Sequence, residues 1–167
     1  PIETVTLPAE LLWQTVPALD PKAYLTAEFA YTGDATLLPS QVQLYRDGMA
    51  IGETWDDALV PGQEREWGFG HDPEVAIDYR LLTDLRASAG LIGGTRRHER
   101  RYAIELTNHR EHPLSMRIID RLPVARDARI EVRLLPDTTT PDTTSFDDKP
   151  GVIAWTRTVA PGDTLEL

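Results

Sequence analysis

The chain has 167 residues and a formal net charge of -10 at pH 7, with 41% hydrophobic and 26% charged residues. This composition is typical of a globular protein rather than a disordered one, and a chain of this length buries about 70% of its unfolded surface when it folds. No apolar run approaches the roughly 20 residues that a membrane span needs, so this segment is not expected to insert into a membrane. The negative charge repels a phosphate backbone, so nucleic acid is not expected as a partner.

Cysteine is absent, which excludes disulfides and thiolate metal sites. The first residues lack a basic region followed by an apolar one, so we expect no signal peptide within this sequence. Because the sequence begins at Pro1, we expect it to be a piece of a longer protein.

Thirteen prolines and eleven glycines divide the chain into strand-length pieces with almost no helical periodicity, which favours an all-β fold. The first clear strand follows residue 22. It is predicted to place a row of apolar side chains on one face: Ala23, Leu25, Ala27, Phe29 and Tyr31.

The Asp47-Gly48 dipeptide lies between two alternating apolar segments, which is the strongest short-range signal for a two-residue hairpin. Such a turn pairs Leu44 with Ile51. The same register would pair Glu53 with Val42 on that face, so we expect a bulge at Gly52. A turn at Pro61-Gly62 then leads into a third alternating segment.

The middle of the chain predicts a turn at residues 71–73, a new strand from Val75, and a small, glycine-rich connection at residues 87–95. A long strand is expected from Arg96 to Leu106, followed by a turn.

Two further strands are expected around residues 114–118 and 130–134, and a polar loop at residues 136–151. The segment 152–159, a Pro161-Gly162 turn and a short strand complete the chain.

The order of strands and turns in residues 1–86 resembles that in residues 96–167. We therefore predict an immunoglobulin-like β-sandwich architecture, with two related antiparallel sandwich units joined by residues 87–95 and packed together. A single larger sandwich is the alternative, and strand spacing does not separate the two.

The turn motifs taken together resemble the C-terminal domain, of unknown function, of the mucoidy inhibitor A family of bacterial proteins. The resemblance rests on the order and spacing of several short motifs: Tyr45-Arg46-Asp47-Gly48, Gly52, Pro61-Gly62, Phe69-Gly70-His71-Asp72-Pro73, Asn108, Pro113, Asp120, Pro123 and Pro161-Gly162. It implies a domain of a larger envelope-associated protein, in the periplasm or cell envelope, and it supplies no catalytic residues.

No group of residues forms a recognisable catalytic or metal site. His109 and His112 lie in a predicted turn without a third ligand, and the HExxH pattern of zinc hydrolases is absent. The acidic pairs at residues 56–57 and 147–148 lack the calcium-loop pattern. No serine has a GxSxG context. We expect no bound metal and no cofactor.

The candidate interaction surface consists of a basic run and two tryptophans. The run at residues 96–101 is the one basic concentration on an acidic chain, and it is typical either of a charged strand that resists edge pairing or of a contact with an acidic partner. Trp13 and Trp55 are the tryptophans outside clear core strands, and they could stack on sugars. The predicted surface comprises Arg96, Arg97, His98, Arg100, Arg101, Trp55 and Trp13.

The sequence therefore favours a non-enzymatic interaction or assembly module. The expected partners are other domains of the full-length protein or other envelope proteins. Binding of carbohydrate, such as an exopolysaccharide, is the first alternative. A metal-dependent hydrolase that uses His71 and Asp72, or the pair His109 and His112, is the second.

Overall fold

The computed structural model describes residues 4–89 and 95–167 of the chain. Strands make up all of the regular structure there apart from one short 3-10 turn, η1 (Phe146–Asp148), so the predicted all-β class is confirmed. The strands are β1 (Ala9–Val16), β2 (Asp20–Ala30), β3 (Ser40–Arg46), β4 (Met49–Asp56), β5 (Glu64–Ala89), β6 (Thr95–Asn108), β7 (Leu114–Arg121), β8 (Val152–Val159) and β9 (Thr164–Glu166).

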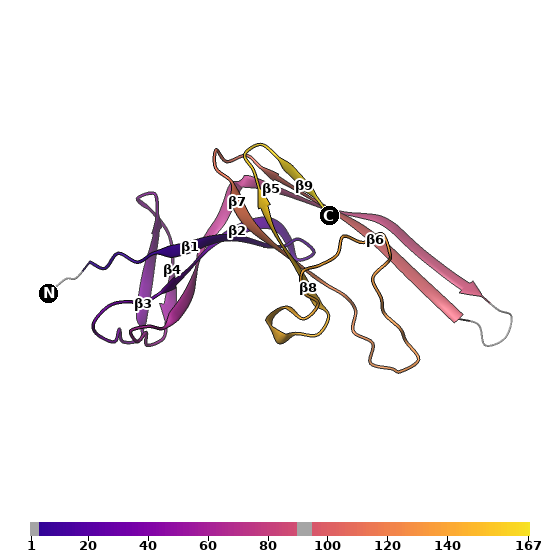
Figure 1. Cartoon of the computed structure of the whole chain (residues 1–167), viewed down its shortest axis with the longest axis horizontal. Helices are drawn as coiled ribbons and strands as arrows, with labels where there is room; N and C mark the ends of the chain where they lie inside the picture. The colour runs from indigo at the N-terminus through magenta and orange to yellow at the C-terminus, as the bar shows by residue number, and fades with distance from the viewer. Residues whose placement is uncertain (1–3, 90–94) are drawn as a thin grey trace.

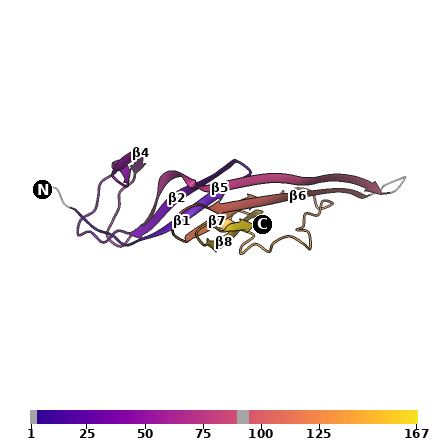
Figure 2. The ribbon, with the colours of Figure 1, turned by 90° about the horizontal axis from the view of Figure 1, so that it is seen from above.

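Seven strands form one sheet in the order β8-β7-β1-β2-β5-β6-β9, and β3 and β4 form a separate hairpin. Neighbours are antiparallel except β1 and β7, which run parallel. The sheet curls, so that β7 and β8 lie across the core from β5 and β6 (Figure 2). The core between these layers includes Leu106, Leu114, Met116 and Ile118, each no more than 2% exposed.

The single large sheet takes β1, β2 and β5 from the first predicted half of the chain and β6 to β9 from the second. The two halves therefore share one core, and the immunoglobulin-like sandwich is not confirmed. The predicted connection at 87–95 falls at the end of the β5–β6 hairpin: 87–89 and 95 belong to the strands, and 90–94 lie outside the described residues.

Two local predictions are confirmed. The five apolar residues predicted for one face of the second strand are all buried: Ala23, Leu25, Ala27, Phe29 and Tyr31. Asp47 and Gly48 form the β3–β4 turn, and both have the positive φ that a type I′ turn requires (52° and 80°).

The bulge in this hairpin lies one residue from its expected place. Leu44 pairs with Gly52 and Tyr45 with Ala50, so Ile51 is the extra residue. The predicted pairing of Leu44 with Ile51 is therefore wrong, while the bulge itself is present and moves the glutamate away from the valine.

Two other predictions are wrong. The expected turn at residues 71–73 lies inside β5, where the pairing with β2 shifts between Lys22 and Tyr24 while Pro73 occupies the irregular stretch. The expected strand at 130–134 is irregular chain, because Ile130 is 57% exposed and of these residues only Leu134 packs against the core.

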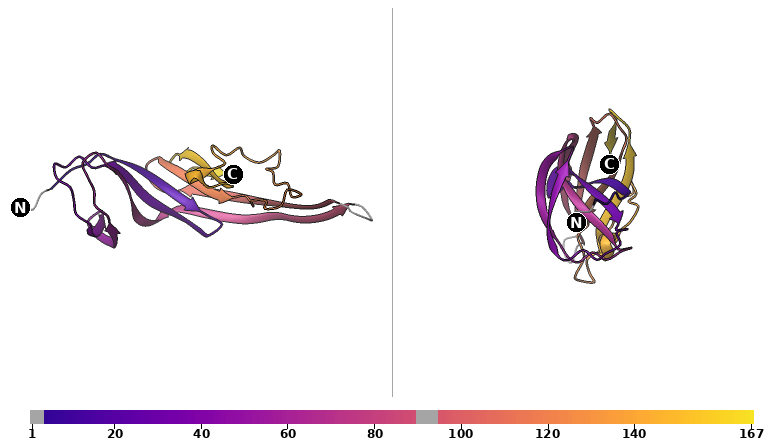
Figure 3. Two further views of the ribbon diagram at one scale, coloured as in Figure 1. Left: turned by 90° about the horizontal axis from the view of Figure 1, so that it is seen from below. Right: turned by 90° about the vertical axis from the view of Figure 1, so that its left-hand side faces the viewer.

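The molecule is elongated, with the β3–β4 hairpin at one end and the β5–β6 hairpin at the other (Figure 1; Figure 3, left). β5 runs through all of it. Viewed from the end of the long axis, the curled sheet has a small cross-section (Figure 3, right).

Asn108 fastens the turn after β6 to the turn before β9. Its side chain is fully buried, and its amide nitrogen donates to the carbonyl oxygens of His112 (3.0 Å), Val159 (3.0 Å) and Ala160 (3.2 Å). Its own side-chain oxygen accepts from the backbone N–H of Arg110 at 2.9 Å. One side-chain amide therefore provides hydrogen-bond partners for backbone groups of two chain segments that are buried next to the core.

We expect Asn108→Asp to destabilise the domain by about 3 kcal/mol or more, because it sets a carboxylate against three carbonyl oxygens. Asn108→Ala removes the donor without adding a charge and should cost less. Urea unfolding followed by tryptophan fluorescence measures both. Equal losses for the two variants would contradict this account of the amide.

Candidate interaction surface

The β5–β6 hairpin extends beyond the rest of the sheet as a two-stranded arm, defined as residues 80–89 and 95–102. β5 pairs with β2 as far as Ala76 and with β6 as far as Ala89. β9 pairs with β6 only over residues 105–107. The arm is therefore a ribbon of two strands that projects from one end of the molecule (Figure 1).

The base of the arm is anchored by aromatic packing. Tyr79 and Tyr102 stack with ring centroids 5.2 Å apart, and Tyr79 packs against the main core. Burial, with a smaller contribution from the charge of Asp120, raises the pKa of Tyr79 to about 12. The phenol is therefore neutral at physiological pH and acts as part of the apolar base.

The arm is basic. It carries six arginines and no lysine against two carboxylates, Asp84 and Glu99, so its net charge is +4 on a chain of net charge -10. Asp84 accepts from His98 (2.7 Å) and Arg100 (3.1 Å). These contacts, the His98 bond first, hold the pKa of Asp84 below its ordinary value despite the opposing effect of partial burial.

Glu99 is held between Arg97 (2.8 Å) and Arg101 (3.0 Å), and Arg101 also binds Asp137 of the loop between β7 and β8. The two carboxylates thus order several arginines, but they leave the arm with an excess of positive charge. Arginine guanidinium groups can bind carboxylates in a bidentate fashion, so the excess of positive charge suits an acidic partner.

The arm also exposes large apolar side chains. Leu81 (54%), Leu82 (60%), Leu85 (59%) and Tyr102 (39%) are accessible to solvent. The sequence prediction named only the basic residues of the arm and missed these. The sequence signal for them was the Leu-Leu pair at 81–82 inside a strand. In the structure the pairing of β5 with β6 shifts between Leu81 and Thr83, so that Leu82 is an extra residue in the strand, and both leucines are exposed.

The structure separates the predicted surface residues into three places. Arg96, Arg97, His98, Arg100 and Arg101 lie together on the arm. Trp55 lies on β4 at the other end of the molecule and is 68% exposed. Trp13 is only 8% exposed, so including it in an exposed surface was wrong.

Trp13 is instead part of a buried polar centre around Asp72. The Asp72 side chain is 1% exposed, and one carboxylate oxygen accepts from the Trp13 indole (2.7 Å) and from Arg110 (2.7 Å). Its other oxygen accepts from the backbone N–H of Glu74 at 3.2 Å. The Arg110 guanidinium also lies over the Trp13 ring, 5.6 Å from the centroid. The centre ties β1, β5 and the turn after β6 together.

Burial alone would raise the pKa of Asp72, but the hydrogen bonds from Trp13 and Glu74 and the charge of Arg110 outweigh it and lower the pKa. A carboxylate stabilised in this way contributes stability above its unfolded pKa of about 3.9, and the contribution disappears as the pH falls through the lower folded value.

We expect Asp72→Asn to destabilise the domain by about 3 kcal/mol at pH 7, because its amide group would face two donors and leave Arg110 without its buried partner. Chemical denaturation at pH 7 and below pH 4 measures the effect, and the difference from the parent chain should shrink at the lower pH. The exposed Asp57 provides the control: Asp57→Asn should stay within about 0.5 kcal/mol of the parent. An equal effect at both pH values would contradict the assignment.

The other candidate groups are not brought together. His71 is exposed and Asp72 is buried, so their side chains point to opposite sides of β5. Among residues 4–89 and 95–167, no cluster of three or more His, Cys, Asp or Glu side chains is arranged to hold a metal ion. Asp56 accepts from the Trp67 indole at 3.0 Å, and Asp147 binds Lys149.

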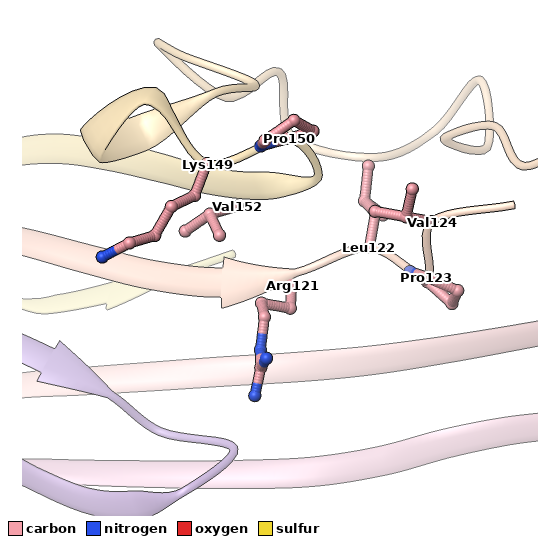
Figure 4. Close-up of a pocket in the computed structure, with 7 residues that line it drawn as sticks. All are labelled: Arg121, Leu122, Pro123, Val124, Lys149, Pro150 and Val152. Carbon is pink, nitrogen blue, oxygen red and sulfur yellow. The ribbon is translucent and has the colours of Figure 1, made fainter. Parts of the chain in front are cut away.

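A cavity of about 580 Å³ lies where the chain leaves β7 and returns to β8 (Figure 4). Two cations, Arg121 and Lys149, line it with five apolar residues, but their side chains extend in different directions. Gly151 permits the close approach of the two segments, since a Cβ there would lie 2.7 Å from Val124. The cavity is therefore a gap between two loops, and its two cations do not point to one place where an anion could bind.

No helix in the described part of the chain is long and apolar enough to cross a bilayer.

The chain is similar to the protein F37C4.5 of Caenorhabditis elegans, with 26% identity over 167 residues that cover 95% of this chain and 30% of that protein. The chain thus spans about a third of the length of this curated relative. No solved structure matches it. The model of the family described as "Domain of unknown function (DUF4139)" matches residues 4–167, and the chain belongs to that family.

Proposed function

We propose that this chain is a non-enzymatic interaction and assembly module of a larger protein, and that the arm is the element that contacts the partner. The arm supports this proposal most directly, because it projects from the body and combines positive charge with exposed leucines. Exposed apolar side chains grouped with arginines are typical of protein contact surfaces.

The groups most suited to catalysis have structural partners, which also supports a non-enzymatic role. Asp72 is bound by Trp13 and Arg110, and Asn108 by backbone carbonyls. The relative in Caenorhabditis elegans is about three times as long as the matched region, which fits a module within a larger protein.

The resemblance to the mucoidy inhibitor A family extends the proposal to partners in a bacterial cell envelope or periplasm, including other domains of the same protein. An immunoglobulin-like arrangement of the curled sheet is part of the same proposal. The proposed role of the arm does not depend on the cellular compartment or on an immunoglobulin-like arrangement.

We expect a photo-crosslinking amino acid at position 82 or 85 of the full-length protein to form a specific adduct in cells, because both leucines are about 60% exposed on the arm. Leu19, which is 73% exposed on the turn between β1 and β2, is the matched control position and should form none. Mass spectrometry of the adducts identifies what the arm touches.

Leu82→Ser with Leu85→Ser should reduce formation of the complex at least tenfold, with stability within about 0.5 kcal/mol of the parent since both side chains are exposed. Crosslinks from position 19 but not from the arm, or turnover of a substrate by a chain that has no partner, would refute the proposal.

One observation favours carbohydrate binding as a second candidate. The β3–β4 register places Trp55 opposite Gln41 and Glu53 opposite Gln43, and Tyr45 follows on the same face. Trp55 is 68% and Tyr45 54% exposed, whereas Leu44 on the other face is 6% exposed. Two exposed aromatic rings with amide and carboxylate groups beside them provide stacking and hydrogen-bonding groups on one flat face.

If this face binds a glycan, Trp55→Ala should reduce binding on a polysaccharide array at least tenfold through loss of the stacking ring. Leu38→Ala, at a 77% exposed position in the same end of the molecule, is the control and should bind like the parent. An array with no binding to the parent chain would rule this candidate out.

A further inference from the structure

The two ends of the molecule carry net charges of opposite sign. The arm carries a net charge of +4. The opposite end, defined as residues 28–66 and called the acidic end below, contains the β3–β4 hairpin and carries eight carboxylates against Arg46 and Arg65, a net charge of -6. The two ends lie at opposite extremes of the long axis (Figures 1 and 2).

The arm and the acidic end of one chain are too far apart to neutralise each other. β5 begins in the acidic end at Glu64 and ends in the arm at Ala89. Its 26 residues, at about 3.3 Å each, span up to ~85 Å. The Debye length is only about 8 Å at physiological ionic strength. Each end therefore presents its charge to other molecules.

Both ends also expose large apolar side chains, which are mainly leucines on the arm and include aromatic rings on the acidic end. The arm presents Leu81, Leu82 and Leu85. The acidic end presents Leu38 (77%), Met49 (68%), Trp55 (68%) and Tyr45 (54%). Arginine guanidinium groups stack on aromatic faces as well as binding carboxylates, so the arm has partners of both kinds on the acidic end.

We propose that the arm binds the acidic end of a second copy of this chain, and that the two copies lie antiparallel with each arm against the acidic end of the other. This inference rests on the proposed function and names its partner. A reciprocal arrangement uses each of the two surfaces on both copies, so the contact is closed and stops at two.

Arm-to-arm contact is the less favourable arrangement, because it brings two charges of +4 together. An anionic membrane is the other acidic surface that the arm could contact. The chain as a whole, with a net charge of -10, is repelled by such a surface, whereas the acidic end of a second copy also offers exposed aromatic rings to the arginines.

The proposal is tested by measuring the molar mass of the 167-residue chain at about 50 mM salt. Size-exclusion chromatography with light scattering and analytical sedimentation both give this mass. The expected mass rises with concentration to a plateau at twice 18.7 kDa and falls at about 500 mM salt, where charge attraction is screened. Arg86→Glu with Arg96→Glu on the arm should weaken dimerisation at least tenfold. Glu53→Lys with Asp57→Lys on the acidic end should do the same.

The four substitutions combined restore opposite charges across the contact and should return dimerisation to within about threefold of the parent. Arg126→Glu with Arg133→Glu, at exposed positions of the loop between β7 and β8, is the matched control and should leave dimerisation unchanged. All six positions changed in these variants are exposed, so the substitutions should not impair folding, which circular dichroism checks.

A chain that stays monomeric at about 100 µM, a mass that grows without a plateau, or a fourfold variant that stays monomeric would each overturn the inference. So would equal losses in the arm variant and the control. Binding of a monomeric chain to anionic vesicles, lost in the arm variant, would assign the arm to a membrane. Crosslinks from positions 82 and 85 to another protein by a chain that does not self-associate would leave the proposed function intact and remove only this inference.

Discussion

The buried carboxylate of Asp72 is the interaction on which the arrangement of the molecule depends. It joins β1, β5 and the turn after β6, because it accepts hydrogen bonds from Trp13 and Arg110. Each of these buried polar groups would destabilise the fold if it lacked a hydrogen-bond partner. The same stretch of β5 carries the irregular pairing with β2. Between the pair of His71 with Tyr24 and the pair of Ala76 with Lys22, β5 changes register, and the bonds to Asp72 hold the strand to β1 and to the turn after β6 at that point.

The arm is a long ribbon with little of the protection that sheets give to their edges. Within the described residues, β5 from Ile77 onward pairs only with β6. A ribbon of this kind invites edge pairing, and charged side chains are the usual defence. Here six arginines stand against two carboxylates, so the arm carries a net positive charge and not the mixed charge of an ordinary guarded edge.

Much of the local structure could be predicted from the sequence, and the arrangement of strands could not. The rows of apolar residues in β2 and β7, and the Asp47-Gly48 turn, follow from period-two alternation and from the need for positive φ. The turn expected at residues 71–73 failed because Asp72 has its partners 59 and 38 residues away, at Trp13 and Arg110, which no local pattern records. The basic part of the candidate site was visible in the sequence, whereas the burial of Trp13 and the exposure of Leu82 depend on the tertiary fold.

The parallel pairing of β1 with β7 has a consequence for how the chain reaches its native state. Gln14 pairs with Arg117, 103 residues further along. A ribosome must therefore synthesise the 103 residues that separate this pair before β1 gains its neighbour, whereas β5 and β6 pair across a short stretch of sequence. Contacts between distant residues carry the larger entropic cost of loop closure. During synthesis, β1 thus has one side open until β7 has been made.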